Sequence, residues 1–109
     1  AYERAGIRLK SIRAVGGGAA IDRQLQLKAN ITGLTVVKGA VTESSALGAA
    51  AYAAAGMGVI ANPADAYRHV KSGEKVFYPD AQAHMRFQNQ FLKYRKLAYA
   101  ANELDGTAR

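Results

Sequence analysis

The stretch AVGGGAAIDRQLQLKANITG, Ala14–Gly33, decides the fold because it joins a strand-like run to a helix through three consecutive glycines. Glycine is costly to order, since it loses more backbone freedom on folding than any other residue. After the glycines, Leu25 and Ala29 recur at helical spacing, and the final Gly33 is a typical helix stop. We therefore predict a helix from about Ala20 to Thr32, preceded by a loop that needs a bare backbone.

The flanking segments alternate between strand and helix signals. Ser11–Val15 and Leu34–Gly39 are expected to be short strands, the second because of its β-branched content. A second helix is expected from a Thr42 cap to about Ala55, with Glu43 in its first turn. Farther on, we expect a short helix starting at Asn62-Pro63, an extended stretch before residue 81, and a long helix from Ala81 to about Asn102. This order predicts an α/β fold: strand, helix, strand, helix, then a helical C-terminus.

Length and composition indicate one small domain. The chain has 109 residues and is 50% hydrophobic, although alanine supplies much of that half. The absence of cysteine excludes disulfides and thiolate metal sites and fits a reducing compartment. Neither a signal peptide nor an apolar run long enough to span a bilayer is recognisable. Two short strands do not make a stable sheet. We therefore expect the rest of the sheet to lie outside this chain.

The chain is basic, with 15 Lys and Arg against 8 Asp and Glu and a net charge of +7. Such a balance is typical of an ordinary solvated surface or of a module that binds nucleic acid or another polyanion. The basic residues are spread over both ends of the chain, and the interleaved aromatic and basic pattern of single-strand readers is absent. A small basic α/β binding module is therefore the alternative interpretation.

The three glycines fit two interpretations. A strand that ends in glycines and opens into a helix lets a phosphate or nucleotide approach the backbone and the helix N-terminus. The dinucleotide fingerprint needs a glycine at its sixth place, where Ile21 stands, and the Lys-Ser/Thr ending of the Walker loop is missing. The plain alternative is a strand-to-helix turn.

The order of motifs beyond the glycines favours the nucleotide interpretation. Gly16–Ala19 reads Gly-Gly-Gly-Ala, and Gln26–Asn30 precedes a glycine at the end of the same helix. Glu43 is then followed by Ala-Leu-Gly-Ala-Ala at 46–50, and the chain closes on a Pro followed by a Tyr/Phe-rich helix. In this order and spacing the chain resembles the C-terminal part of the FGGY family of carbohydrate kinases.

The resemblance implies that residues 1–109 are the C-terminal portion of an actin-like (ribonuclease H-like) ATPase domain. It places ATP against Gly16, Gly17, Gly18 and Ala19, with Asp22 near the nucleotide. It also implies that Gly48 lets the second helix pack closely beside this loop. Mg²⁺ would accompany ATP, but the residues that bind it, the sugar-binding domain and the catalytic Asp base lie upstream in the family.

The resemblance further implies that the whole protein transfers the γ-phosphate of ATP to a hydroxyl of a sugar or polyol. A pentulose is our first expectation for the substrate, and we expect the isolated chain to be inactive because it lacks the catalytic base. We expect a cytoplasmic enzyme that binds no nucleic acid and no membrane, and the open edges of an incomplete sheet favour a homodimer. Asn30 in place of the family's Asp, and Gln24 in place of a large aromatic, put the subfamily in doubt.

Several other side chains have a structural and a functional interpretation. His69 and His84 are expected on the surface, since no carboxylate is spaced to form a metal site with either. Lys38 is expected at a solvated strand end, with phosphate binding as the alternative. Ser44 is read as part of a helix start rather than as a catalytic group. The two remaining expectations concern helix faces: Phe87, Phe91 and Tyr94 form either core or a docking surface, and Ala46, Ala49, Ala50 and Ala53 allow close helix or sheet packing.

Overall fold

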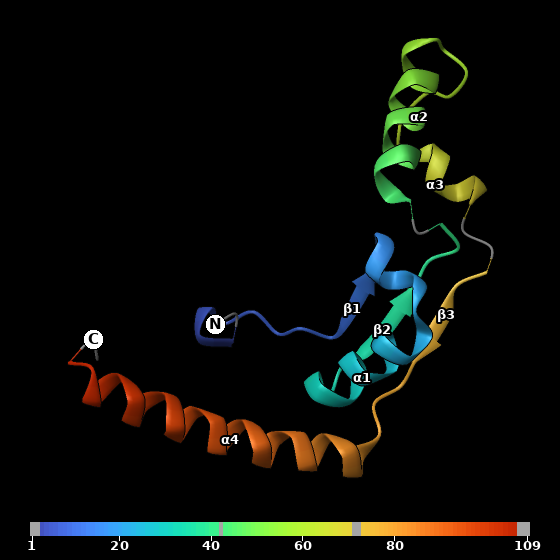
Figure 1. The fold of residues 1–109 in the computed structure, drawn as a ribbon. Coiled ribbons are helices and arrows are strands. Elements are labelled where there is room, and N and C mark those ends of the chain that lie inside the picture. The colour runs from blue at the N-terminus through green and yellow to red at the C-terminus, as the bar shows by residue number, and fades with distance from the viewer. Residues whose placement is uncertain (1–2, 42, 71–72, 107–109) are drawn as a thin grey trace.

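The computed structural model describes residues 3–41, 43–70 and 73–106 of the chain. Figure 1 shows a small sheet with a helix beside it, further helices beyond one end of the sheet, and a long helix that leads away from it. The elements in chain order are η1 (Glu3–Ala5), β1 (Ser11–Ala14), η2 (Gly17–Ala20), α1 (Asp22–Thr32), β2 (Thr35–Lys38), α2 (Ser44–Gly56), α3 (Asp65–His69), β3 (Lys75–Phe77) and α4 (Ala81–Leu104). The predicted α/β order is confirmed, and α1 and β2 fall within about two residues of their expected bounds.

The sheet has three strands in the order β1-β2-β3. Strands β1 and β2 are parallel, with Ile12 opposite Val36, and α1 is the crossover between them. Strand β3 is antiparallel to β2, with Val36 opposite Phe77. The sequence predicted this last segment only as an extended stretch, and its pairing gives the sheet the third strand that a two-stranded ribbon would lack.

Helix α1 packs on one face of this sheet and forms the core with it. Leu25 and Ala29, one helical turn apart, are fully buried together with Val36, and Phe77 is 7% exposed. Ile12 and Ala14 of β1 are partly buried against this cluster because alternate residues of a strand point to the same face. This small core fixes how β1, α1 and β2 lie relative to one another.

The end of α1 is a glycine cap that α4 covers. Gly33 has the left-handed φ of 69° and donates its N–H to the carbonyl oxygen of Ala29 at 2.8 Å. A Cβ built on Gly33 would lie 2.8 Å from the ring of His84. The His84 Nδ1 donates to the carbonyl oxygen of Asn30 at 3.0 Å. The expectation of a surface His84 is therefore wrong, because this ring packs between α1 and α4.

Two polar side chains of α1 hold the segment that enters α4. Gln26 donates from Nε2 to the carbonyl oxygen of Tyr78 at 2.7 Å. The Oδ1 of Asn30 accepts from the backbone N–H of Asp80 at 2.9 Å, and Asp80 in turn caps α4 by accepting from Ala83 N–H at 2.9 Å. Gln26 and Asn30 therefore have a structural role that positions the start of α4.

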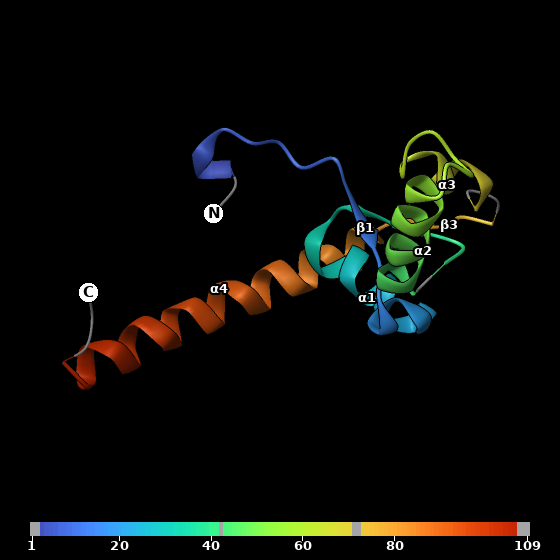
Figure 2. The same ribbon diagram turned by 90° about the horizontal axis from the view of Figure 1, so that it is seen from above.

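The expected close packing of α2 is not observed. Its face of Ala46, Ala49, Ala50 and Ala53 is exposed, and no described atom lies within 4 Å of a Cβ placed on Gly48. Helix α2 packs mainly on α3 and lies beyond the end of the sheet (Figures 1 and 2), so it does not pack beside the glycine loop. The expected Thr42 cap lies outside the described residues, and Glu43 occupies the N-cap position rather than the first turn.

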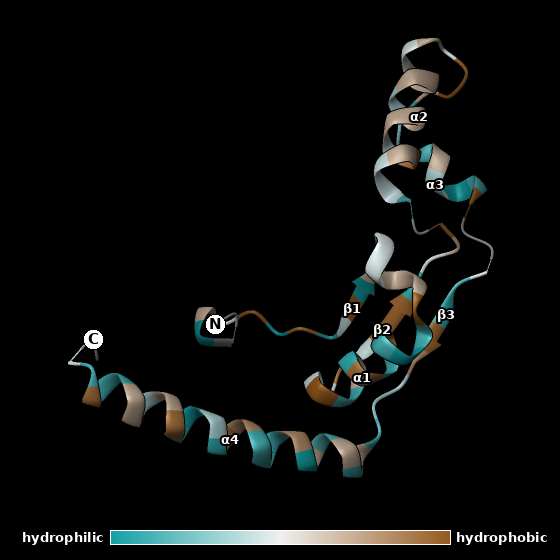
Figure 3. Ribbon diagram, in the orientation of Figure 1, coloured by the Kyte–Doolittle hydropathy of each residue, from teal (hydrophilic) through white to brown (hydrophobic). Residues whose placement is uncertain are grey.

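The expectation that the aromatic face of α4 packs in the core is also wrong for the described part of the chain. Phe91 and Tyr94 are 52% and 65% exposed, and only Phe87, nearest the start of the helix, is half-buried. After its first turns α4 runs away from the sheet (Figure 2), with apolar and polar residues alternating along its surface (Figure 3). The docking interpretation of this face stays a prediction. Over the described residues, no helix has both the length and the apolar character needed to cross a membrane.

We predict that Gly33→Ala lowers the free energy of unfolding by about 2 kcal/mol, because it adds left-handed strain and displaces the His84 ring. Gly48→Ala is the matched control, since it lies inside α2 in open space and is expected to raise stability by up to about 1 kcal/mol. Urea unfolding measures both. An unchanged midpoint for Gly33→Ala would contradict the packing of α4 on this cap.

Candidate functional site

The glycine loop follows the carboxyl end of β1. Gly16 has φ 85° and ψ −179°, a conformation that side-chain-bearing residues rarely adopt. Its carbonyl oxygen accepts from Ala19 N–H at 3.0 Å, which closes the turn of η2. Ala19 is 2% exposed, so its methyl group anchors the turn. Gly16 and Ala19 are therefore explained by the fold itself.

Gly17 and Gly18 are not explained in this way. Neither has a positive φ, and a Cβ built on either meets no described atom within 4 Å. Both lie at the carboxyl edge of a parallel strand pair, where ligands of α/β sheets bind. The loop thus presents bare backbone to open space at a position that suits a ligand.

Asp22, the first residue of α1, lies at the other end of this loop. Its Oδ1 is 3.0 Å from the Nζ of Lys38 and its Oδ2 is 2.5 Å from the Nζ of Lys75. The Lys38 Nζ also donates to the carbonyl oxygen of Ala20 at 3.3 Å. Hydrogen bonds from Lys75 and then Lys38 lower the pKa of the Asp22 carboxyl below its ordinary value.

These contacts change the interpretation of Lys38 and add a residue that the sequence did not indicate. Lys38 is not a solvated strand end, because its side chain is 23% exposed and paired with Asp22. Lys75 lies 53 residues from Asp22, and no local pattern links the two. Only the pairing of β3 with β2 brings Lys75 to the loop.

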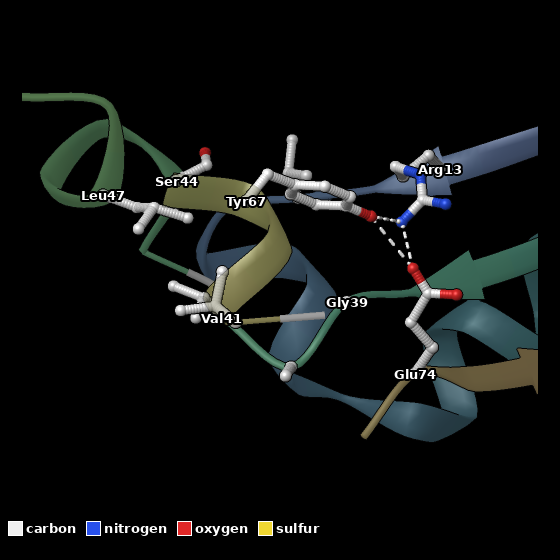
Figure 4. A pocket seen from close by; sticks show the side chains of 10 residues that line it. Arg13, Gly39, Val41, Ser44, Leu47, Tyr67 and Glu74 are labelled. Atoms are coloured by element: carbon white, nitrogen blue, oxygen red, sulfur yellow. Dashed lines mark hydrogen bonds and ion pairs between the residues drawn. The ribbon is translucent and has the colours of Figure 1, made fainter. Parts of the chain in front are cut away.

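A cavity of about 190 Å³ lies at the same edge of the sheet (Figure 4). Val15, directly before the glycines, is part of its wall. At one end Arg13 Nη1 donates to Tyr67 OH at 2.6 Å and to Glu74 Oε1 at 2.7 Å, and Tyr67 OH donates to Glu74 at 2.9 Å. The hydrogen bond to Glu74 raises the pKa of Tyr67. The remaining lining residues are mainly apolar: Gly39, Ala40, Val41, Ser44, Leu47 and Val70.

Arg13, Tyr67 and Glu74 form a polar group that could not be found from the sequence alone. Arg13 lies 54 residues from Tyr67 and 61 residues from Glu74. Its members hydrogen-bond to one another, which joins β1 to α3 and to the segment before β3. Among the described residues no three His, Cys, Asp or Glu side chains come together to hold a metal ion, and His69 is exposed.

Taken together, a parallel strand pair, a crossover helix and an open glycine loop define an α/β module with bare backbone at the carboxyl edge of its sheet. Residues 1–57 match the model described as the FGGY family of carbohydrate kinases, C-terminal domain. The chain belongs to this family, as the resemblance implied.

Individual relatives agree with this assignment. The chain is 32% identical to the L-xylulose/3-keto-L-gulonate kinase of Escherichia coli K12 over 83% of this chain and 18% of that protein. It is 28% identical to the xylulose kinase of Bacillus subtilis 168 over 95% of this chain and 21% of that protein. The ligand-bound xylulose kinase of Lactobacillus acidophilus superimposes with a TM-score of 0.67 and 26% identity over 83% of this chain and 18% of that one. The predicted kinase-type fold is confirmed, and the chain spans about a fifth of these relatives' length.

The Asp22 ion pairs predict an acid-sensitive contribution to stability. Since the folded-state pKa of Asp22 is lowered, the contribution is present above the unfolded-state pKa of about 3.9 and is lost as the pH falls through the folded-state value. Asp22→Asn is therefore expected to be less stable than wild type at pH 6, with the gap closing at pH 2.5. Urea midpoints at both pH values test this.

The matched control is Glu103→Gln, at an exposed carboxylate that has no ion pair with the described residues. We expect its midpoint to follow wild type at both pH values. An Asp22→Asn gap of equal size at pH 6 and pH 2.5 would contradict the ionic role of Asp22.

Proposed function

We propose that this chain supplies the adenosine-binding wall of an ATP-dependent carbohydrate kinase, which transfers the γ-phosphate of ATP to a sugar or polyol hydroxyl. Membership of the FGGY family supports the reaction class. The kinase names of the relatives, which are about five times longer, support it as well. This chain would then contribute nucleotide binding, while the rest of the protein contributes the sugar site and the catalytic base.

The observation that carries this proposal is the pair of glycines at 17 and 18. Conformation and packing explain Gly16 and Ala19 but leave these two unexplained within the described chain. A side chain at either position would fill space next to the backbone at the carboxyl edge of the sheet. A nucleoside lying in that space gives a physical reason for two consecutive residues without side chains.

The chain's own residues would act on the nucleotide by position. The backbone of Gly16–Gly18 would line the nucleoside, and the N-terminus of α1 would offer unpaired N–H groups to a phosphate. Asp22 would accept hydrogen bonds near the nucleoside as an ionised carboxylate, because Lys38 and Lys75 stabilise its ionised form. Phosphoryl transfer depends largely on such positioning and on charge neutralisation. ATP would supply the transferred phosphoryl group.

The groups that carry out proton transfer and bind Mg²⁺ would lie elsewhere in the complete protein. We propose that the base, an Asp, and the residues around Mg²⁺ lie upstream of the glycine loop, as the family resemblance implies. We therefore propose that this chain alone transfers no phosphate.

Substrate, location and assembly are proposals of the same kind. Two relatives bear the names of xylulose-type kinases, so we propose a ketopentose as the first substrate to test. We place the enzyme in the cytoplasm, where ATP is available. No nucleic-acid or membrane partner is proposed. The outer edges of β1 and β3 are unpaired in the described part of the sheet, which favours pairing with a second copy or with further strands of the complete protein.

Gly18→Val tests the proposal directly. In the complete gene product we expect this change to weaken ADP binding by about ten-fold or more, which is about 1.4 kcal/mol, because the valine side chain occupies the nucleoside's space. Isothermal titration calorimetry measures the affinity. Unfolding by urea should be nearly unchanged, since the added side chain meets open space in the described chain.

Gly56→Ala is the control, because it also places a methyl group in open space but lies at the end of α2. We expect it to keep wild-type ADP affinity. Equal ADP affinity in wild type and Gly18→Val would contradict the nucleotide wall. A complete protein that phosphorylates no sugar or polyol in an ATP-coupled panel would contradict the kinase assignment.

A further inference from the structure

Two lysines face each other where the sheet meets the glycine loop. Lys38 ends β2 and Lys75 begins β3, and the strand register places them directly opposite one another. Like charges opposite each other in an antiparallel pair are destabilising. A sheet that keeps this pair therefore needs a group that neutralises it.

Asp22 is that group. Each carboxylate oxygen pairs with one lysine. Oδ1 lies 3.0 Å from the Nζ of Lys38, and Oδ2 lies 2.5 Å from the Nζ of Lys75. Lys38 also reaches the carbonyl oxygen of Ala20, the last residue of the glycine turn, at 3.3 Å. The edge of the sheet is thus connected to two points at the carboxyl end of the loop. We call these three side chains, Lys38, Asp22 and Lys75, the lysine clamp.

A loop of glycines and alanines has few side-chain atoms, so apart from the buried methyl group of Ala19 it is held mainly at its ends. Gly17 and Gly18 have no side-chain atoms that could pack or hydrogen-bond, and their surroundings within 4 Å of a Cβ are empty in the described chain. The first end is fixed by β1 and by the bond from Ala19 N–H to the carbonyl of Gly16. The second end is fixed by the lysine clamp.

We infer that Lys38 and Lys75 are positioning residues for the nucleotide: through Asp22 and the Ala20 carbonyl they set the shape of the Gly16–Ala20 loop before a nucleotide binds. This inference rests on the proposed function. The side chains of Lys75 and Asp22 are 59% and 43% exposed, and that of Lys38 is 23% exposed. Ion pairs with an exposed partner contribute only modestly to global stability. The clamp should therefore affect the order of the loop, and with it the affinity for the nucleotide, more than it affects folding.

The test uses Lys38→Met and Lys75→Met in the complete gene product, with the sugar that gives turnover. Methionine keeps most of the aliphatic stem and removes the charge. We expect each change to raise the KM for ATP and the Kd for ADP about five-fold or more. The KM for the sugar should stay at the wild-type value, and the urea midpoint should fall by no more than it does in Asp22→Asn, which loses both ion pairs. Lys38→Arg should keep the wild-type KM for ATP, because a guanidinium keeps the positive charge beside Asp22.

Lys28→Met is the matched control. Lys28 is an exposed residue of α1, the helix that begins with Asp22, and it has no ion pair with the described residues. It should keep the wild-type KM for ATP. An unchanged KM for ATP in both clamp variants would overturn the inference. So would an equal rise in the KM for the sugar, together with a urea midpoint below that of Asp22→Asn, which marks a purely structural role.

The two proposals fail in different ways. If the wild-type protein transfers phosphate to no sugar, the kinase assignment fails, and calorimetry with ADP still measures the clamp. If the wild type is active and the clamp variants bind ADP as tightly as wild type does, only the clamp inference fails.

Discussion

The packing of helix α1 on the parallel strands β1 and β2 is the contact on which the other features depend. Leu25 and Ala29 are fully buried against Val36, so α1 has one position relative to the strands. A parallel pair requires such a crossover, and the connection from β1 into α1 must pass over the carboxyl edge of the sheet. The glycine loop therefore opens at this edge, with the first turn of α1 directly after it. The lysine clamp and the polar group around Arg13 are built around the same edge.

The sequence predicted the parts of this structure that have local signals. The spacing of Leu25 and Ala29 and the stop at Gly33 placed α1, and the β-branched run at 35–37 placed β2. Gly33 shows why such a signal is strong: it needs the left-handed φ, and it leaves room for the ring of His84. The order of glycine loop, helix and second helix was also enough to identify the family.

Contacts between distant segments could not be predicted in this way. His84 was expected on the surface, yet it donates to Asn30, 54 residues earlier in the chain. Lys75 and Glu74 join Asp22 and Arg13 only because β3 pairs with β2, and a three-residue strand has too little pattern to reveal that pairing. The exposure of α2 and of the aromatic face of α4 has another origin. Helix α2 has the alanine-rich composition of a buried helix, and α4 carries exposed Phe91, Tyr94 and Tyr99. We expect these faces to pack on parts of the complete protein that lie outside this chain.

If the glycine loop binds the nucleotide, bound ADP should protect the amides of this loop from hydrogen exchange. The measurement compares peptides of the complete gene product with and without saturating ADP. We expect slower exchange in the peptide that spans Val15–Arg23, with unchanged exchange in a peptide from the exposed second half of α4. Binding of ADP with no protection in the Val15–Arg23 peptide would show that the nucleotide binds elsewhere.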